Sequence, residues 1–370
     1  MRVLVTGGAG FIGSHVVDGL LRRGHAVRVL DALLPPVHPA PRPPAYLAPQ
    51  AELVVGDVRR KEDWERALPG VDAVIHLAAY QDYLPEFSRF AHTNDVGTAL
   101  LFEVAVARGL ALRKVVLGSS QAVYGEGQYT CPVHGIQYPP PRDLARLRRG
   151  EWEIPCPQGG EPMTPAWTDE GTVAPLNPYG VSKYAQELYA RTLGRLYNIA
   201  IVALRYSIVQ GPRQSPFNAY SGILRIFVGR LRRGLPPIIY EDGEQVRDYI
   251  AVEDAVAATL LVLELDPCPY AVLNVGGGSS ITVREYARLI GEVMGRSIDP
   301  QVPGEFRHGD VRHIRSDVSR LRSLGWEPQT PLRDVVARYT QWLETVPGAT
   351  DLSEETLGQM RELGVVRRVT

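Results

Sequence analysis

The sequence predicts an α/β fold, a Rossmann-type doubly wound parallel sheet with a smaller α/β lobe packed beside it. Two observations lead to this prediction. Short β-branched runs alternate with amphipathic helical stretches through the first half of the chain, which is typical of a parallel sheet whose strands are connected by helices. A glycine-rich turn also joins the first run to the first helical stretch, where nucleotide-binding sheets have their phosphate-binding loop.

Each expected element has a local signal. The runs 3–5 and 27–30 are rich in valine and leucine, and the apolar residues of 12–23 recur at helical spacing until Gly24 ends the helix. The same alternation predicts further strands at 52–55, 73–77, 114–117, 201–204, 249–250 and 271–275, and further helices at 60–68, 94–109 and 179–197.

Composition excludes several classes of protein. The 370 residues carry 40 basic and 41 acidic side chains, and the net charge of −1 gives no electrostatic footprint for a nucleic-acid partner. No apolar run reaches the roughly 18 to 20 residues that span a bilayer, and because Met1 leads directly into a strand-like run, we expect no signal peptide. Three cysteines do not make a disulfide framework. The sequence therefore predicts a cytoplasmic protein with no membrane or nucleic-acid partner.

The glycine-rich turn predicts a pyrophosphate site. Gly7, Gly10 and Gly13 have the GxxGxxG spacing, in which glycine allows a tight turn, close approach of a phosphate and close helix packing. Phe11 and Ile12 open the following helix, whose free N–H groups favour an anion.

Asp31 predicts which cofactor binds there. It ends the second expected strand, 24 residues after Gly7, where a carboxylate accepts hydrogen bonds from an adenosine ribose and repels a 2′-phosphate. Ala32 and Leu33 follow it, so no adjacent arginine receives such a phosphate. The sequence therefore favours NAD over NADP. The alternative for the glycine-rich segment is a turn that binds no cofactor.

Tyr179 and Lys183 lie four residues apart, on one face of the expected helix. The chain has 17 tyrosines but only three lysines, so chance would give about 0.14 such pairs. An adjacent ammonium favours the phenolate of a tyrosine, which is otherwise a poor base at neutral pH. Ser120 follows the strand at 114–117 and is placed at the carboxyl edge of the sheet, facing the ligand. Helix packing and loop capping are the alternative roles for these side chains.

Further motifs complete a recognisable order along the chain: 6–13, Asp31, 56–58, 76–79, Asn94, 119–125, 179–183, 204–206, 211–213, 247–249, 274–276 and 309–312. In this order they resemble the extended short-chain dehydrogenase/reductases, and in particular the NAD-dependent nucleotide-sugar epimerase/dehydratase group. The resemblance covers about residues 1–345, apart from an insertion at 126–175.

The resemblance implies a role for each matched residue. NAD would be held by Gly7, Gly10, Phe11, Ile12, Gly13, Asp31, Asp57, Val58, Leu77, Ala78, Ala79, Asn94, Tyr179, Lys183 and Tyr206. The catalytic residues would be Ser120, Tyr179 and Lys183. A nucleotide-sugar substrate would be held by Ser120, Gln121, Arg213, Arg247 and Arg312, with the arginines on its pyrophosphate. For Arg213, a surface salt bridge is equally expected.

The resemblance also implies the organisation of the chain. Residues 1–205 would form the NAD-binding domain and 206–370 mainly the substrate-binding lobe, with the strands near 249–250 and 271–275 returning to the large sheet. Beyond the resemblance, the spacing of Leu352, Leu357, Met360 and Leu363 predicts a helical tail at 350–370. The helices near 94–109 and 179–197 would pair with their copies in a homodimer.

Two departures from the family pattern narrow the expected reaction. Gln121 and Ala122 stand where dehydratases and decarboxylases of the group have an additional acid, and neither side chain transfers a proton at neutral pH. Ile208 replaces an asparagine that touches the substrate diphosphate in the family, which favours a sugar or base other than that of UDP-glucose.

The expected activity is epimerisation of a UDP- or dTDP-hexose at C4 through a 4-keto sugar. A 4-keto-sugar reductase or a C2 epimerase is the alternative, ahead of a 4,6-dehydratase and a non-catalytic NAD-binding regulator.

The insertion contains half of a zinc-ribbon pattern. Cys131-x-x-His134 is followed by Cys156-x-x-Gly159, and because structural zinc takes four ligands, glycine at the fourth position leaves three. A degraded ribbon without metal, with two buried thiols, is therefore expected, and a zinc site is the alternative.

Overall fold

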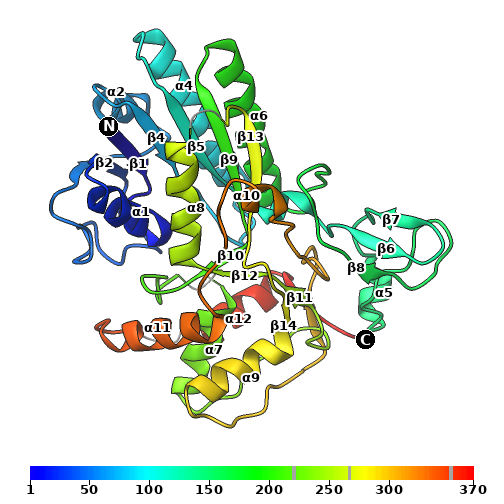
Figure 1. The fold of residues 1–370 in the computed structure, drawn as a ribbon. Coiled ribbons are helices and arrows are strands. Elements are labelled where there is room, and N and C mark those ends of the chain that lie inside the picture. Colours follow the sequence, from blue (N-terminus) through cyan, green and yellow to red (C-terminus); the bar gives the residue numbers. More distant parts are fainter. Residues whose placement is uncertain (219–221, 266–267, 350–352) are drawn as a thin grey trace.

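A seven-stranded parallel sheet forms the centre of the protein, in a computed structural model that describes residues 1–218, 222–265, 268–349 and 353–370 (Figure 1). The strand order is β13-β9-β5-β4-β1-β2-β3, and every pairing in this sheet is parallel. The strands are β1 (Arg2–Thr6), β2 (Ala26–Asp31), β3 (Glu52–Val55), β4 (Ala73–His76), β5 (Lys114–Ser120), β9 (Ala200–Tyr206) and β13 (Ala271–Val275). The predicted doubly wound fold is confirmed, and its topological switch point lies between β1 and β4, where such sheets bind their ligands.

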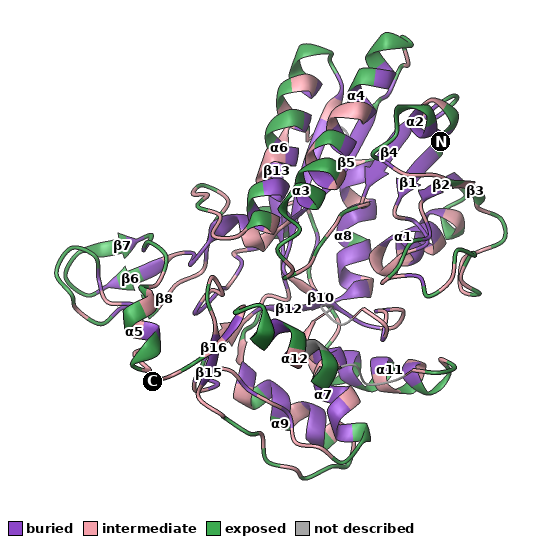
Figure 2. Cartoon of the chain, turned by 180° about the vertical axis from the view of Figure 1, so that it is seen from behind, coloured by how far each residue is buried: buried purple, intermediate pink, exposed green. Residues whose placement is uncertain are grey.

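Helices cover both faces of the sheet (Figure 1). One face is covered by α1 (Phe11–Arg22) and α8 (Val252–Glu264), and the other by α2 (Lys61–Ala67), α4 (Gly97–Ala107) and α6 (Pro178–Leu196). The short helices α3 (Phe87–Phe90) and η1 (Ala91–Val96) lead into α4. The buried strands between exposed outer helix faces are evident in Figure 2. No helix in the described part of the chain combines the length and hydropathy that crossing a bilayer requires.

A smaller lobe lies below the carboxyl edge of the sheet (Figure 1). Its helices α7 (Ile223–Arg232), α9 (Val283–Val293) and α11 (Leu332–Glu344) share one apolar cluster. Three two-stranded sheets complete it, formed by β10 (Ile208–Gln210) with β12 (Tyr249–Ala251), β11 (Val246–Arg247) with β14 (Ile281–Thr282), and β15 (Glu305–Arg307) with β16 (Val366–Arg368). The helix α10 (Ser319–Arg322) packs near β13.

Two expectations about this half of the chain need correction. The strand near 249–250 does not return to the large sheet, because β12 pairs with β10, a continuation of the chain beyond the end of β9. The strand at 271–275 does join the large sheet, as β13 beside β9. The tail is helical only over α12 (Ser353–Glu362). After it the chain forms the strand β16, in which Val366 is buried. Residues 350–352 lie outside the described part.

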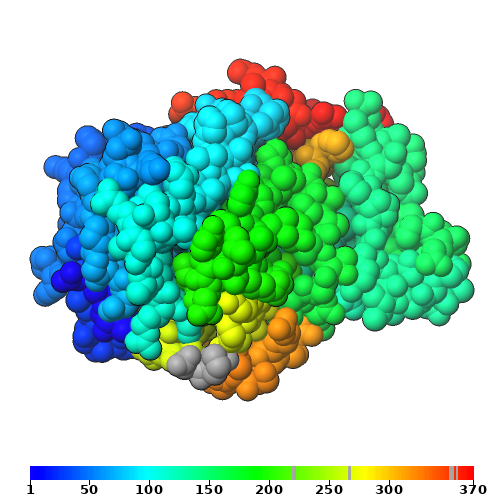
Figure 3. All heavy atoms as spheres, turned by 90° about the horizontal axis from the view of Figure 1, so that it is seen from above, coloured from blue at the N-terminus to red at the C-terminus, as the bar shows by residue number. Residues whose placement is uncertain are grey.

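The insertion after β5 forms a separate small unit. It begins after the turn η2 (Gln121–Tyr124) and contains β6 (Tyr129–Cys131), β7 (Gly135–Gln137), α5 (Leu144–Arg148) and β8 (Thr164–Pro165), with its strands in the order β7-β6-β8. Figure 3 shows it as a bulge at the side of the molecule.

A buried ion pair fastens α6 to the sheet. The guanidinium of Arg205 in β9 donates to both carboxylate oxygens of Glu187 in α6, at 2.9 and 2.8 Å, and both side chains are almost wholly buried. Ser119 in β5 donates to the same carboxylate at 2.5 Å, and Arg205 also donates to the hydroxyl of Tyr124 in η2. Three elements that surround the carboxyl edge are therefore held by one carboxylate.

We expect Glu187→Gln to destabilise the protein by about 3–5 kcal/mol, because it leaves the buried Arg205 charge without its partner. Thermal denaturation followed by circular dichroism measures the effect. Glu292→Gln is the control, since the Arg333–Glu292 pair is exposed and contributes about 0–1 kcal/mol. Equal melting temperatures for the two variants would contradict this account of the pair.

Candidate functional site

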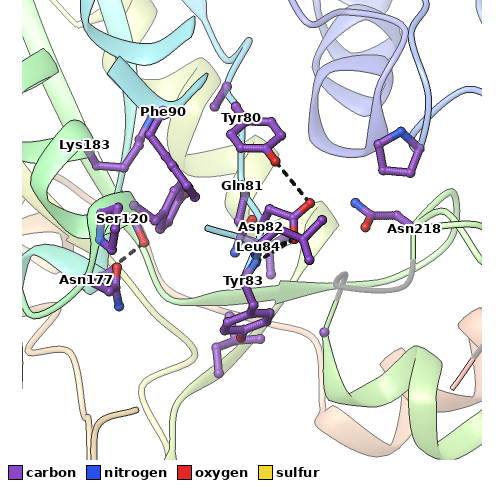
Figure 4. A pocket seen from close by; sticks show the side chains of 18 of the residues that line it. Tyr80, Gln81, Asp82, Tyr83, Leu84, Phe90, Ser120, Asn177, Lys183 and Asn218 are labelled. Atoms are coloured by element: carbon purple, nitrogen blue, oxygen red, sulfur yellow. Dashed lines mark hydrogen bonds between the residues drawn. The ribbon is translucent and has the colours of Figure 1, made fainter. Parts of the chain in front are cut away.

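A cavity of about 980 Å³ lies between the carboxyl edge of the sheet and the lobe. Its walls come from the turn after β1, the ends of β2, β4 and β5, the start of α6, and the lobe segments around α7 and β15. Figure 4 shows Ser120, Lys183 and Asn177 at one side, the 80–84 segment in the middle, and Asn218 beyond it. This volume lies at the upper end of the range of small-molecule and cofactor sites.

The glycine-rich turn has the geometry of a phosphate-binding loop. Gly7 has a φ of +67°, which side chains rarely adopt, and a Cβ on Gly13 would lie 2.1 Å from the carbonyl oxygen of Gly7. Helix α1 therefore starts directly against the turn, with Gly10 as its N-cap residue. The unpaired N–H groups of its first turn lie beside a cavity lined by Gly10, Phe11 and Ile12.

Asp31 closes one end of the cavity. Its carboxylate accepts the backbone N–H of Ala9 at 3.0 Å and that of Leu33 at 2.9 Å, which fixes its orientation at the end of β2. His38, which sequence analysis did not select, is buried with Nε2 3.5 Å from Asp31 Oδ1. Asp57 lies further along the same wall, paired with Arg59.

Tyr179 meets Ser120 because α6 approaches η2 unusually closely. Asn177 caps α6 by accepting the N–H of Gly180 at 2.8 Å, and a Cβ on Gly180 would lie 2.4 Å from the carbonyl oxygen of Ala122. The Ser120 hydroxyl accepts the Ala122 N–H at 3.1 Å and hydrogen-bonds the phenol of Tyr179. Ser120 is thus oriented to donate its proton to the tyrosine oxygen.

Burial and charge act in opposite directions on the two titrating groups. Burial raises the pKa of Tyr179 to about 12, against the lowering effect of the Ser120 hydrogen bond. Burial lowers the pKa of Lys183 to about 8, and the carboxylates of Glu187 and Asp95 partly oppose this. Asp95, a residue missed by sequence analysis, is itself half-buried, and burial raises its pKa to about 6. The lysine therefore stays mostly cationic near neutral pH, one helical turn after Tyr179 in α6.

A chain of buried hydrogen bonds joins Lys183 to Thr6, the last residue of β1. Lys183 donates to Gln186 at 2.5 Å, and Gln186 donates to Thr98 at 2.6 Å. His76 lies between Thr98 and Thr6, at 3.1 and 2.7 Å. Burial lowers the pKa of His76 to about 3, so the ring is neutral. Because Thr98 donates to a backbone carbonyl, it accepts from His76 Nε2, and Thr6 donates to Nδ1.

Most residues expected at the site line this cavity. For the cofactor these are Gly7, Gly10, Phe11, Ile12, Gly13, Asp31, Asp57, Val58, Leu77, Ala78, Ala79, Tyr179, Lys183 and Tyr206, and for the substrate they are Ser120, Gln121 and Arg247. The hydroxyl of Tyr206 is engaged by Thr259 at 2.7 Å. Its ring, rather than its oxygen, is therefore the part that a ligand meets.

Three expected residues do not line the cavity. Asn94 is wholly buried, and its amide is used by the backbone of Tyr80 and by Ser182, so it positions the cavity wall. Arg213 forms a salt bridge with Asp18 at 2.8 Å, which agrees with the alternative given for this residue rather than with substrate binding. Arg312 is wholly buried, and its guanidinium is shared by Glu153, Glu241 and Asp242.

Arg307, rather than Arg312, lines the cavity. Its side chain lines the cavity beside Arg247, between the rings of Tyr83 and Tyr240. Asp310 accepts its Nε–H at 2.8 Å. Arg307 and Arg312 flank the Gly309–Asp310 pair in the sequence. Only their burial in the structure distinguishes the arginine that faces the cavity, Arg307, from the one that does not. Arg247 keeps its position by donating to the carbonyls of Val311 and Arg312.

Comparison with known proteins places these features in context. The family described as "NAD dependent epimerase/dehydratase family" matches residues 3–143 and 156–276. A dTDP-L-rhamnose 4-epimerase from Burkholderia thailandensis is 36% identical over 350 residues, covering 92% of this chain and 94% of the relative. The crystal structure of a UDP-glucose 4-epimerase from Thermotoga maritima with UDP-glucose has a TM-score of 0.74 and 32% identity, covering 93% and 99% of the two chains. The Thermus thermophilus UDP-glucose 4-epimerase in complex with NAD has a TM-score of 0.72 and 29% identity, with the same coverage.

The residues present fit NAD, which is the cofactor of this family. The cavity runs from Asp31, a carboxylate suited to ribose hydroxyls, past the turn at Gly10 and the N-terminus of α1, to Tyr179 and Lys183. The close contact between Gly13 and Gly7 leaves the backbone itself as the phosphate-facing surface. These features match a dinucleotide with a pyrophosphate at its centre.

We expect Gly13→Ala to weaken NAD binding at least about tenfold, an effect of about 1.4 kcal/mol, because the added methyl group forces α1 away from the turn. Isothermal titration calorimetry measures the affinity, and circular dichroism checks the fold. Gly358→Ala in α12, where a Cβ meets no other atom within 4 Å, is the control. An unchanged NAD affinity in a folded Gly13→Ala protein would refute the assignment of the turn.

Proposed function

We propose that this chain, which belongs to the NAD-dependent epimerase/dehydratase family, is a nucleotide-sugar 4-epimerase acting on a UDP- or dTDP-hexose. One observation carries the choice within the family. Tyr179 and Ser120 face the cavity together, and the two residues after Ser120 that also line it are Gln121 and Ala122, which carry no carboxyl group. Elimination of water needs an acid near the sugar as well as the tyrosine base, whereas oxidation and return at C4 need only one group that takes and gives back a proton.

Tyr179 is the proton acceptor in this proposal. Its oxygen receives the proton of the sugar 4-hydroxyl while Ser120 hydrogen-bonds the same substrate oxygen. Burial raises the pKa of Tyr179, and in this proposal the cation of Lys183, one helical turn later in α6, favours the phenolate against that effect. When bound, NAD supplies the acceptor and donor of the hydride at C4. The same tyrosine returns its proton to the 4-oxygen when the sugar is reduced again.

Epimerisation requires the sugar to present both faces while its nucleotide stays bound. Arg247 and Arg307 line the lobe side of the cavity and are suited to the diphosphate, because guanidinium groups bind phosphate oxygens in pairs. The carbonyl groups around Arg247 and the carboxylate of Asp310 hold both guanidinium groups in place. A fixed diphosphate and a wide cavity allow the ring alone to turn over.

The expected homodimer has support from one surface. Helix α6 carries exposed apolar residues along its outer side, namely Val181, Leu188, Tyr189 and Leu196, and Val106 in neighbouring α4 is also exposed. Exposed apolar side chains that recur along neighbouring helices are typical of a protein interface. We propose that two copies pack through these helices.

Replacing the proposed base tests the mechanism. We expect Tyr179→Phe to lower kcat at least about 1000-fold, because general base catalysis contributes about 10²–10⁴, while NAD remains bound. A coupled assay with UDP- and dTDP-hexoses measures turnover, and Tyr138→Phe, at an exposed tyrosine of the insertion, is the control. Activity of Tyr179→Phe near that of the unaltered protein would exclude this role. Stoichiometric consumption of free NADH by the unaltered protein would identify a reductase instead.

The diphosphate contact predicts a different kinetic change. We expect Arg307→Gln to raise KM about 10- to 100-fold with a smaller effect on kcat, since a hydrogen bond to a charged group contributes about 1.5–3 kcal/mol. Steady-state kinetics measures both constants. Arg338→Gln, which removes an exposed arginine on α11, is the control. An unaltered KM in Arg307→Gln would show that the nucleotide binds elsewhere.

A further inference from the structure

Four potential metal ligands meet in the insertion, on the side of the molecule away from the glycine-rich turn (Figures 1 and 3). Cys131 ends β6, His134 lies in the turn to β7, and Cys156 and Glu161 flank a second turn. Their ligand atoms all lie within 4.8 Å of one another. The expectation that only three ligands are available is therefore wrong, because Glu161 supplies a fourth.

Four of the six distances between the ligand atoms match the edges of a small tetrahedron, and the other two are within 4.8 Å. His134 Nδ1 lies 3.6 Å from Cys131 Sγ, 3.4 Å from Cys156 Sγ and 3.4 Å from Glu161 Oε2, and Cys131 Sγ lies 3.8 Å from Glu161 Oε2. A tetrahedral zinc ion with ordinary Zn–S, Zn–N and Zn–O bond lengths has ligand–ligand distances of about 3.3–3.8 Å. Each of these distances joins the same few atoms, His134 Nδ1, the two Sγ atoms and Glu161 Oε2, as expected for ligands of one ion.

Gly159 explains how Glu161 reaches this position. A Cβ on Gly159 would lie 2.3 and 2.4 Å from the two carboxylate oxygens of Glu161. The glycine that interrupts the cysteine pattern in the sequence is thus the residue that makes room for the carboxylate. The backbone N–H of His134 donates to Cys131 Sγ at 3.4 Å, a contact that stabilises a thiolate ligand.

We propose that the insertion binds one zinc ion through Cys131 Sγ, His134 Nδ1, Cys156 Sγ and the carboxylate of Glu161. Two thiolates, an imidazole and a carboxylate in tetrahedral arrangement suit Zn²⁺ better than the hard cations Mg²⁺ or Ca²⁺. Four protein ligands leave no open position for a substrate, so the ion is structural.

The packing of the insertion shows why it needs such an ion. Its apolar core consists of five residues, two of which are the cysteines; the others are Tyr129, Ile154 and Met163. A core of this size is too small to stabilise a unit of its length, and small units of this kind commonly depend on a metal or a disulfide. Both cysteines are free and buried.

The ion would hold the part of the insertion that supports the substrate side of the cavity. Arg142 is buried and donates to both carboxylate oxygens of Glu241, at 3.0 and 2.8 Å, and to the carbonyl of Asp310. Glu153 binds Arg312 and His313. Glu241 and Asp310 line the cavity. Loss of the ion would therefore loosen the segment that positions Arg307, without touching the NAD side.

Metal analysis of the full chain tests the proposal independently of any activity. We expect inductively coupled plasma mass spectrometry of the untagged protein to find one zinc per chain, in the unaltered protein and in the control Cys268→Ser. Cys156→Ser should lose the zinc. Glu161→Gln should bind it at least about 100-fold more weakly, whereas Glu151→Gln, an exposed carboxylate in the same insertion, should not. Gly159→Ala should weaken binding as well, since its methyl group displaces the Glu161 carboxylate.

X-ray absorption of the unaltered protein keeps the test valid if a variant does not fold. We expect two sulfur neighbours at about 2.3 Å and two nitrogen or oxygen neighbours at about 2.0 Å. A protein without zinc after purification and reconstitution, or a Cys131–Cys156 disulfide found by mass spectrometry, would overturn the proposal. Full zinc content in both Cys156→Ser and Glu161→Gln would also overturn it, since the ion would then lie elsewhere.

Discussion

The buried pair of Arg205 and Glu187 is the constraint on which the reactive end of the cavity depends. It joins the end of β9 to the middle of α6, and Ser119 joins the end of β5 to the same carboxylate. Because α6 is rigid, fixing Glu187 also fixes Lys183 one turn earlier and Tyr179 two turns earlier. The absence of a side chain at Gly180 then lets Tyr179 reach Ser120. The carboxylate also supports the charge of Lys183, so one group contributes to both stability and the electrostatics of the site.

The opposite wall of the cavity depends on a second set of buried charges. Arg312 binds carboxylates from the insertion and from the lobe, and Arg142 of the insertion binds Glu241. A charge that is wholly buried persists only when it is paired, so these contacts hold the insertion and the lobe in one arrangement. The insertion is therefore part of the substrate side of the cavity, although its own strands pair only with one another.

Local motifs predicted the helices and strands well, because each depends on neighbouring residues, and the residues expected to hold the cofactor line one cavity, apart from Asn94. The glycine spacing, Asp31 and the Tyr179–Lys183 pair needed no knowledge of distant contacts. Predictions that depended on distant contacts were less successful. Arg307 and Arg312 both lie beside Gly309–Asp310 in the sequence. What separates them is the set of carboxylates around Arg312, which come from two distant segments, the insertion and the lobe. For the same reason the pattern predicted the strand at β12 but not its partner, and it could not show that Glu161 fills the space above Gly159.

Nuclear magnetic resonance of the purified protein with UDP- and dTDP-hexoses in heavy water tests the proposed 4-epimerase activity most directly. Direct return of hydrogen to C4 predicts a new C4 epimer that carries no deuterium on carbon, with no net use of NAD, and it identifies the nucleotide at the same time. Deuterium at C5 together with loss of water would contradict the account, because it would mean that the cavity supplies an acid that Gln121 and Ala122 do not provide.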